Sequence, residues 1–288
     1  MKRIGALEAG GTKMVLACGN ENGEIYDRVS IPTLTPAETM PEIAAYFKSQ
    51  KIDALGIACF GPIDVRPQSE GYGTILMTPK IPWRRYNIVK YLREELQVPI
   101  RLDTDVNGSA IGEHRFGAGR DVDSLLYITI GTGIGIGVII DGKPLHGALH
   151  PEGGHILMQR IPGDDFTCNC PNHDCCFEGM AAGPSIEKRW GKKAFELAED
   201  PRVWALESSY IAQAITDYIM TLSPERIILG GGVMKQTQLF PLIREKTIDY
   251  IHGYLVMPEL QDIEHYIVPA GCGEDQGILG CIAMASNL

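Results

Sequence analysis

The sequence predicts an α/β fold of two domains with a cleft between them, and two observations support this prediction. The first is a repeated strand meander: residues 3–31 and 124–147 each read as strand, glycine-rich turn, strand, turn and strand. The two copies begin about 120 residues apart, which indicates a duplicated domain. The second is that alternating helical and strand patterns come after each meander, as in layered α/β folds.

The helices and strands after each meander can be assigned in order from hydrophobic periodicity. In the first half, helix, strand, helix, strand and helix are expected at residues 37–50, 53–60, 87–97, 99–102 and 106–116. In the second half, a long helix, a strand running into a glycine turn and another helix are expected at residues 203–222, 225–233 and 239–251. A boundary within 117–123 predicts domains at 1–118 and 119–272, the first completed by a C-terminal helix at 273–288.

Composition and charge limit the class of protein. The 288 residues are 44% hydrophobic and 22% charged, an ordinary globular balance. The chain opens without an apolar leader and has no long apolar run, so we expect a cytoplasmic protein with no membrane partner. The net charge is −10, and a surface that binds nucleic acid normally carries a basic stripe. We therefore expect no nucleic-acid partner, although backbone N–H groups can still hold the phosphates of a nucleotide.

Residues 168–179, CNCPNHDCCFEG, contain four cysteines, a histidine and a glutamate. In a reducing cytosol, such clustering indicates a metal site rather than a set of disulfides. The acidic charge disfavours a zinc site that serves DNA binding, which leaves a zinc site that holds part of an enzyme pocket in place. The other four cysteines are expected to be small buried residues: Cys18, Cys59, Cys272 and Cys281.

Three glycine-rich turns, at 8–13, 130–135 and 229–233, each come after an apolar strand. Without Cβ atoms, backbone amides can approach a phosphate or a nucleobase closely. Each turn alone is also consistent with a simple hairpin, and none has the spacing of a Walker A loop or a Rossmann fingerprint. Together, in matching places of a duplicated domain, they resemble the phosphate and adenosine loops of the actin-like, ribonuclease H-like ATPases.

The order of motifs from residue 7 to residue 234 makes the resemblance more specific. The segments LEAGGTK, FGPID, DTDVNGSAIGE, GTGIGIGV, PEGGH, CPNHDCCFEGMAAGP and ILGGGV resemble those of the ROK family of sugar kinases, and in particular its bacterial fructokinases. The resemblance implies a duplicated actin-like fold and transfer of phosphate from ATP, with Mg²⁺, to a hexose. The expected reaction converts D-fructose to fructose 6-phosphate, and the expected assembly is a homodimer.

By this resemblance, Asp105 is the general base that accepts the proton of the attacking hydroxyl. An aspartate where a strand meets a helix is otherwise more often an N-cap. Asp103 is expected to cap or pair locally. The family often has asparagine directly before the base, where this chain has Thr104; this difference fits the fructokinase branch and weakens an assignment to glucose.

The resemblance also implies the substrate contacts. Carboxylates suit a sugar because they accept hydrogen bonds from adjacent hydroxyls, and the expected sugar contacts are Gly61, Asn107, Glu152, His155 and Glu178. The nucleotide is expected to be held by the glycine turns and by one proline: Gly10, Gly11, Thr12, Lys13, Gly131, Thr132, Gly133, Pro184, Gly230, Gly231, Gly232 and Val233.

The expected zinc ligands are Cys170, His173 and Cys176 in a CxxHxxC pattern, with His155 as the fourth. Four nitrogen and sulfur ligands complete a tetrahedral site, so this zinc would be structural. It would tie His155 to the segment that leads to Glu178. The alternative is the CxCxxxxC spacing common in the family, which would use Cys168, Cys170 and Cys175.

Three other functional classes share parts of this pattern. A ROK-type repressor would carry an N-terminal helix-turn-helix, whereas the first strand here begins near residue 3. A non-catalytic sugar sensor would lack the base or the phosphate loops, and both are present. A kinase for glucose, mannose or an N-acetylated hexosamine is the main alternative to a fructokinase.

Overall fold

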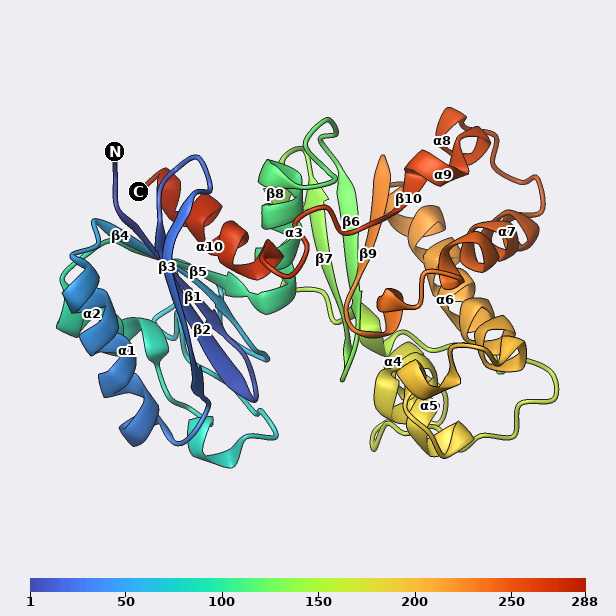
Figure 1. The fold of residues 1–288 in the computed structure, drawn as a ribbon, viewed down its shortest axis with the longest axis horizontal. Helices are drawn as coiled ribbons and strands as arrows, with labels where there is room; N and C mark the ends of the chain where they lie inside the picture. Colours follow the sequence, from blue (N-terminus) through green and yellow to red (C-terminus); the bar gives the residue numbers. More distant parts are fainter. The chain divides into compact units, whose positions relative to one another are not determined.

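The protein is described by a computed structural model of residues 1–288 (Figure 1). The chain divides into two compact units. Unit 1 comprises Met1–Arg120, Pro144–His150 and Gly271–Leu288, and unit 2 comprises Asp121–Lys143 and Pro151–Ala270. The short segment Pro144–His150 therefore belongs to unit 1, although the sequence places it in the second predicted domain.

Unit 1 contains a five-stranded sheet in the order β3-β2-β1-β4-β5. The predicted meander is antiparallel, and the two later strands run parallel to β1. The strands are β1 (Ile4–Ala9), β2 (Lys13–Gly19), β3 (Ile25–Pro32), β4 (Ala54–Cys59) and β5 (Ile100–Thr104). β4 is buried along its whole length, as expected for a parallel strand covered on both faces.

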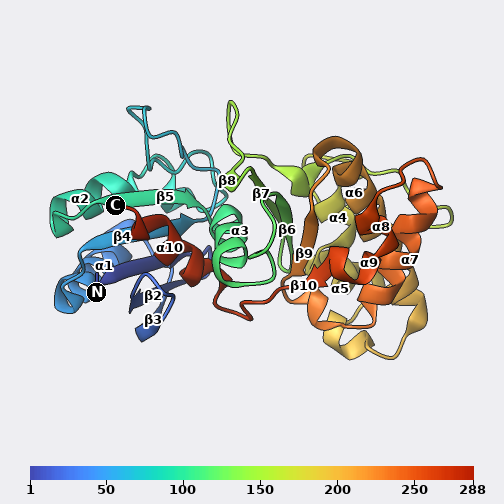
Figure 2. The ribbon, with the colours of Figure 1, turned by 90° about the horizontal axis from the view of Figure 1, so that it is seen from above.

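Helices cover both faces of this sheet (Figures 1 and 2). Because side chains alternate across a strand, Leu7 and Ala9 of β1 join the larger core cluster, whereas Ile4 and Ala6 join the smaller one. The larger cluster lies beneath α1 (Pro36–Gln50) and α2 (Ile88–Leu96), and the smaller one beneath α10 (Gln276–Ser286). A short 3-10 helix, Ile81–Trp83, precedes α2.

α10 and α3 (Asp105–Phe116) pack unusually close together. A Cβ atom on Gly280 would lie 1.7 Å from the carbonyl oxygen of Gly108, so only glycine fits at this crossing. The contact brings the C-terminal helix against the helix that begins with Asp105. It explains why residues 271–288 belong to unit 1.

Unit 2 repeats the plan of unit 1 with a sheet in the order β10-β9-β6-β7-β8. Its strands are β6 (Leu125–Ile130), β7 (Ile134–Ile140), β8 (Lys143–Pro144), β9 (Arg226–Gly230) and β10 (Ile267–Pro269). The meander is again antiparallel at β6–β7, and β9 and β10 are parallel to β6. The third strand has only two residues, against eight in unit 1.

The helices of unit 2 include the two long ones that the sequence predicts, α6 (Pro201–Leu222) and α7 (Leu239–Ile251). The shorter helices are α4 (Phe177–Ala181), α5 (Gly183–Trp190), α8 (Pro258–Gln261) and α9 (Ile263–Tyr266), with 3-10 turns at Gly153–His155, Ala194–Leu197 and Val233–Lys235. None of the helices combines the length and the apolar character needed to cross a membrane. The predicted duplicated α/β architecture is confirmed by the matching strand order of the two sheets.

Candidate active site

The ends of three neighbouring strands define one edge of the sheet in unit 1. Ala9 of β1 pairs with Cys59 of β4, and Cys59 pairs with Thr104 of β5. The residues directly after these strand ends are therefore neighbours across the sheet. They are the turn Gly10–Lys13, the loop that begins at Phe60, and Asp105, all three of which the sequence singled out. The carboxyl ends of parallel strands are where α/β proteins bind their ligands.

Asp105 is the first residue of α3, and the cap of this helix is its neighbour. The Oγ1 atom of Thr104 accepts a hydrogen bond from the Asn107 N–H at 3.2 Å, so Thr104 is the N-cap. The Asp105 side chain accepts from the Val106 N–H at 2.9 Å and the residue is partly exposed. The positive end of the helix dipole favours the ionised carboxylate here. The cap interpretation of Asp105 therefore does not hold.

Asp103 pairs locally, as the sequence suggests, and also with a residue that the sequence did not single out. It is 4% exposed and accepts hydrogen bonds from the Thr104 N–H at 2.8 Å and from Asn107 Nδ2 at 2.7 Å. His146 Nε2 lies 2.9 Å from its Oδ2 atom. This hydrogen bond to Asp103 raises the pKa of His146, against the opposing effect of burial. The segment Pro144–His150 is thus attached to the junction between β5 and α3.

Two other polar side chains near this edge, those of Asn107 and Asp64, form hydrogen bonds to neighbouring residues of the protein. Asn107 is 1% exposed and its amide nitrogen bonds Asp103, so in this structure it supports the junction. Asp64, in the loop after Gly61, forms a two-point pair with Arg66 and accepts from Ser69 Oγ. Its pKa is lowered, chiefly by the hydrogen bonds from Arg66. The role of Gly61 and Asn107 in sugar binding stays a prediction.

In unit 2, Glu178 lies against the glycine turn between β6 and β7. Its Oε2 atom accepts from the Ile134 N–H at 2.9 Å, and a Cβ on Gly133 would lie 2.7 Å from the same oxygen. Its Oε1 atom is 3.7 Å from His155 Nε2. Glu152 is exposed and immediately precedes the turn Gly153–His155. Three predicted sugar contacts, Glu152, His155 and Glu178, thus belong to unit 2, and two of them are adjacent.

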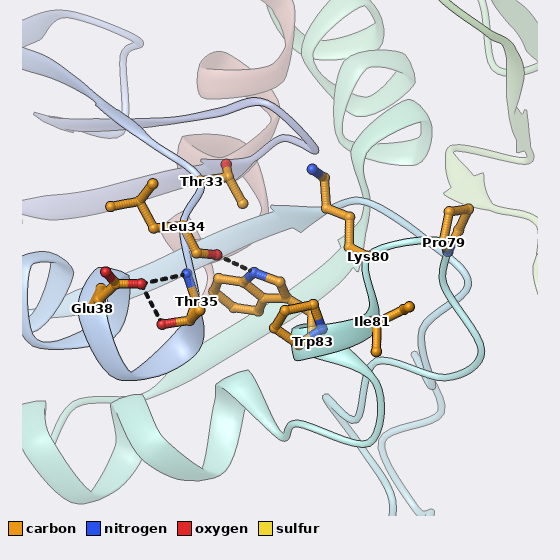
Figure 3. Close-up of a pocket in the computed structure, with 9 residues that line it drawn as sticks. Thr33, Leu34, Thr35, Glu38, Pro79, Lys80, Ile81 and Trp83 are labelled. Atoms are coloured by element: carbon orange, nitrogen blue, oxygen red, sulfur yellow. Dashed lines mark hydrogen bonds between the residues drawn. The ribbon is translucent and has the colours of Figure 1, made fainter.

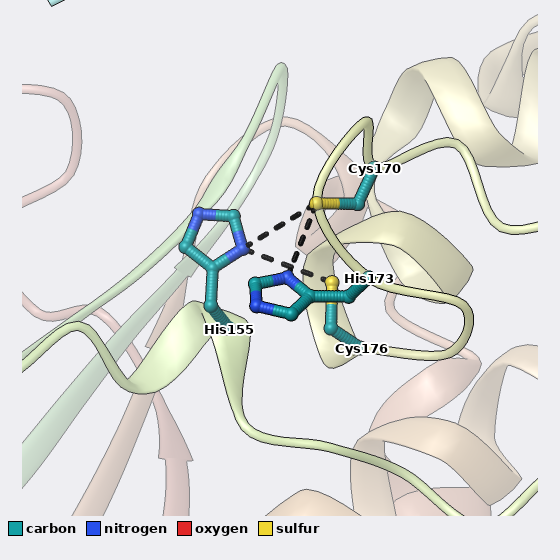
Figure 4. A group of neighbouring side chains, drawn as sticks. All are labelled: His155, Cys170, His173 and Cys176. Atoms are coloured by element: carbon teal, nitrogen blue, oxygen red, sulfur yellow. Dashed lines mark hydrogen bonds between the residues drawn. The ribbon is translucent and has the colours of Figure 1, made fainter.

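The four predicted zinc ligands gather in one cluster (Figure 4). Their donor atoms all lie within 4.8 Å of one another. His155 Nδ1 is 3.7 Å from Cys176 Sγ and 4.0 Å from Cys170 Sγ, and His173 Nδ1 is 3.3 Å from Cys170 Sγ. Ligands at the usual zinc distances in a tetrahedron are about 3.3–3.8 Å apart, so the donor set fits zinc. Cys168 and Cys175 are not part of this group.

Backbone pairing assembles the cluster from two separate segments. Leu157 and Cys176 form an antiparallel bridge, and the Phe177 N–H donates to Ile156 O at 3.0 Å. Cys176 is fully buried and caps α4, its sulfur accepting from the Gly179 N–H at 3.4 Å. The same pairing therefore positions His155, Cys176 and the helix that carries Glu178.

Several of the predicted nucleotide contacts line one pocket in unit 2. A pocket of about 390 Å³ is lined by Gly131, Thr132, Gly183, Pro184, Glu187, Lys193, Ala194, Phe195, Gly232 and Val233. Five of these residues are in the predicted nucleotide set: Gly131, Thr132, Pro184, Gly232 and Val233. The Gly183 N–H donates to Gly131 O at 2.8 Å and joins two of the lining segments. Phe195 is 69% exposed and offers an aromatic face that the sequence did not indicate.

Gly231 is constrained by the turn in which it lies, and its predicted contact with the nucleotide stays a prediction. Its φ is +91°, and a Cβ there would lie 2.4 Å from the Ile130 carbonyl oxygen. The glycine is therefore required by the turn itself. Gly232 is the residue whose missing Cβ leaves open space beside the pocket.

Comparison with known proteins identifies the family. The model of the ROK family matches residues 4–287. This chain belongs to the ROK family. A fructokinase of Pediococcus pentosaceus is 48% identical to this ROK chain over 282 residues, which cover 98% of this chain and 97% of that protein.

Solved ROK structures resemble this one along the whole chain. A ROK hexokinase from Thermus thermophilus has a TM-score of 0.78 at 27% identity, covering 98% of this chain and 97% of that one. A ROK family glucokinase from Streptomyces griseus, solved with glucose and AMPPNP, has a TM-score of 0.77 at 25% identity, covering 99% and 100%. These similarities confirm the predicted actin-like ATPase fold.

The pair formed by His146 and Asp103 predicts a pH-dependent contribution to the stability of this ROK protein. Because the folded-state pKa of His146 is raised, the contribution is complete below about pH 6.5, the usual histidine pKa. It is lost as the pH rises through the folded-state pKa. We expect His146→Gln to lower the melting temperature at pH 6 by roughly 2 °C, because a partly exposed pair contributes little, and by less at pH 9.

The control is Gln261→Ala, because Gln261 is exposed at the end of α8 and its side chain does not titrate. Its melting-temperature difference from wild type should be the same at both pH values. Calorimetric melting of the three proteins measures this. A His146→Gln difference that stays constant from pH 6 to pH 9 would contradict the role of the charged pair.

Proposed function

We propose that this protein transfers the γ-phosphoryl group of ATP to a hexose, with the 6-hydroxyl of D-fructose as the preferred acceptor. The observation that supports this most strongly is Asp105, a partly exposed residue that begins α3 without capping it and lies on the same sheet edge as the turn Gly10–Lys13. The 48% identity to the Pediococcus fructokinase supports the choice of sugar. Glucose, which accompanies the Streptomyces neighbour, is the second candidate.

In the proposed reaction, Asp105 accepts the proton of the sugar hydroxyl as its oxygen attacks the terminal phosphorus of ATP. Mg²⁺ bound with ATP would neutralise charge on the phosphates. Glu8, at the end of β1 next to the glycine turn, is a candidate to hold that ion directly or through water; burial raises its pKa, an effect that Arg28 and Lys13 partly oppose. Thr104 and the bonded set around Asp103 keep Asp105 in place.

The unit 2 residues would serve binding in the same reaction. Glu152, His155 and Glu178 would accept or donate hydrogen bonds to sugar hydroxyls. The pocket lined by Gly131, Thr132, Pro184, Gly232 and Val233 would take the adenosine part of ATP, and its volume of about 390 Å³ suits a small ligand. Phe195 would stack on the base.

A structural zinc would hold His155 through Nδ1 and leave its Nε2 atom facing Glu178. A histidine ligand whose second nitrogen meets a carboxylate is a common arrangement at zinc sites. All four positions of a tetrahedral site would be filled by protein, so the zinc would not take part in the chemistry.

The first test is a coupled ADP-release assay with a panel of hexoses at saturating Mg·ATP. We expect the highest kcat/KM with fructose.

Asp105→Asn removes the proton acceptor with little change of shape, so its kcat should fall roughly 10²-fold or more while calorimetry shows sugar binding retained. Wild-type protein without any sugar-dependent ADP formation would disprove the kinase proposal. A kcat of Asp105→Asn within a few-fold of wild type would disprove the role of the base.

The nucleotide pocket is tested at Gly232, because this residue has helical backbone angles and a Cβ there meets no other atom within 4 Å. Gly232→Leu would place a side chain into the pocket, and we expect the KM for ATP to rise roughly tenfold or more, since tenfold corresponds to about 1.4 kcal/mol. The KM for fructose should not change. Gly147→Leu is the control, since its nearest neighbour is 3.7 Å away. Equal ATP KM values in the two variants would contradict the assignment.

The zinc proposal predicts one zinc per chain, held by His155, Cys170, His173 and Cys176. Cys176→Ser should lose the metal and raise the KM for sugar, because metal binding orders the segments that carry His155 and Glu178. Cys168→Ser is the matched control and should keep the metal. Elemental analysis by mass spectrometry decides between them: zinc kept in Cys176→Ser and lost in Cys168→Ser would favour the three-cysteine alternative.

A further inference from the structure

Unit 1 has a shallow pocket of about 510 Å³ at its surface, next to the turn between β1 and β2 (Figure 3). Its floor is Trp83, which is 1% exposed. The indole Nε1 donates to Leu34 O at 2.7 Å, and the Trp83 N–H donates to Lys80 O at 2.9 Å. Trp83 thus attaches the segment that carries Lys80 to the chain just after β3.

The same stretch of chain after β3 holds the glycine turn. The Thr33 N–H donates to Thr12 O at 3.0 Å, and Thr33 Oγ1 donates to Gly10 O at 2.7 Å. Since Thr33 and Leu34 are consecutive, one short segment binds the turn on one side and Trp83 on the other. Lys80 is therefore held at a defined place relative to the turn.

The Lys80 side chain lies over the turn. A Cβ on Gly11 would be 3.0 Å from Lys80 Cε, the carbon that carries the ammonium group. Figure 3 shows the side chain extending away from Trp83 and from Glu38, the one carboxylate that lines the pocket. Glu38 is already bonded to Thr35, within the capping box of α1.

Lys80 is half-buried, and its ammonium group has no carboxylate and no hydrogen-bond acceptor in this structure. Lysine commonly packs its aliphatic stem against protein and keeps its ammonium group in water, where an anion can reach it. Lysine is a compact point charge that commonly binds phosphate. A free lysine ammonium above a glycine turn therefore indicates that an anion completes the site.

We propose that Lys80 binds the terminal phosphoryl group of ATP above Gly11 and stabilises it during transfer. This inference rests on the proposed kinase function and adds a residue that contacts the transferred group. As the sugar oxygen bonds to phosphorus, the bond from phosphorus to the ADP oxygen breaks and the hydroxyl proton passes to Asp105. Lys80 keeps its own protons and donates hydrogen bonds to the equatorial phosphoryl oxygens, where charge gathers in the transition state.

The test uses Lys80→Met, which keeps the length of the side chain and removes the charge. Its matched control is Lys90→Met, because Lys90 is an exposed lysine of α2 with no side-chain partner. Calorimetry measures the dissociation constants of Mg·AMPPNP and Mg·ADP for both variants and wild type. We expect Lys80→Met to weaken AMPPNP binding roughly tenfold relative to ADP, which lacks the terminal phosphate. Lys90→Met should leave the ratio of the two constants unchanged.

Kinetics supply a second, independent measurement. The kcat of Lys80→Met should fall about 10- to 100-fold with the KM for sugar unchanged, since the contact strengthens in the transition state. Lys80→Arg should recover part of this loss. Equal weakening of AMPPNP and ADP, or no weakening of either, would overturn the role of Lys80. Wild-type protein that binds both nucleotides but phosphorylates no hexose would instead disprove the kinase proposal, while the AMPPNP to ADP ratio would still test Lys80.

Discussion

The alignment of the ends of β1, β4 and β5 is the constraint on which the candidate site of unit 1 depends. Ala9, Cys59 and Thr104 are paired across the sheet, so the residues directly after each strand must emerge at one edge. A shift of one residue in either pairing would turn every side chain of that strand to the other face. It would also move the turn Gly10–Lys13 away from Asp105.

Around that edge, charged groups are fixed by neighbouring residues that have no proposed part in the reaction. Thr104 caps the helix, Asp103 binds His146, and Trp83 holds the segment of Lys80. These contacts fix the segments that carry Asp105 and Lys80. In a chain of net charge −10, the anion site proposed at Lys80 would depend on one positive group held over a glycine turn, which the overall charge does not indicate.

In unit 2, a cluster of two histidines and two cysteines takes the place of the strand edge. The short pairing of residues 156–158 with 175–177 brings His155 to Cys176 before any metal is considered. The zinc proposed here would strengthen an arrangement that the backbone already forms, because ligand order and helix start coincide at Cys176. The position of Glu178 and the integrity of the cluster are thereby coupled.

The sequence by itself determined most of the elements and the duplicated α/β plan, because periodicity and glycine turns are local properties. The four side chains of the Cys/His cluster were predicted from the resemblance to the ROK family, since spacing alone also allowed the set of Cys168, Cys170 and Cys175. Only the tertiary structure decided that Thr104 rather than Asp105 is the cap, that Gly231 is required by its own turn, that His146 binds Asp103, and that Lys80 lies over Gly11. His146 is 43 residues from Asp103 along the chain. Such contacts arise from strand register and from packing between distant segments, and no local pattern encodes them.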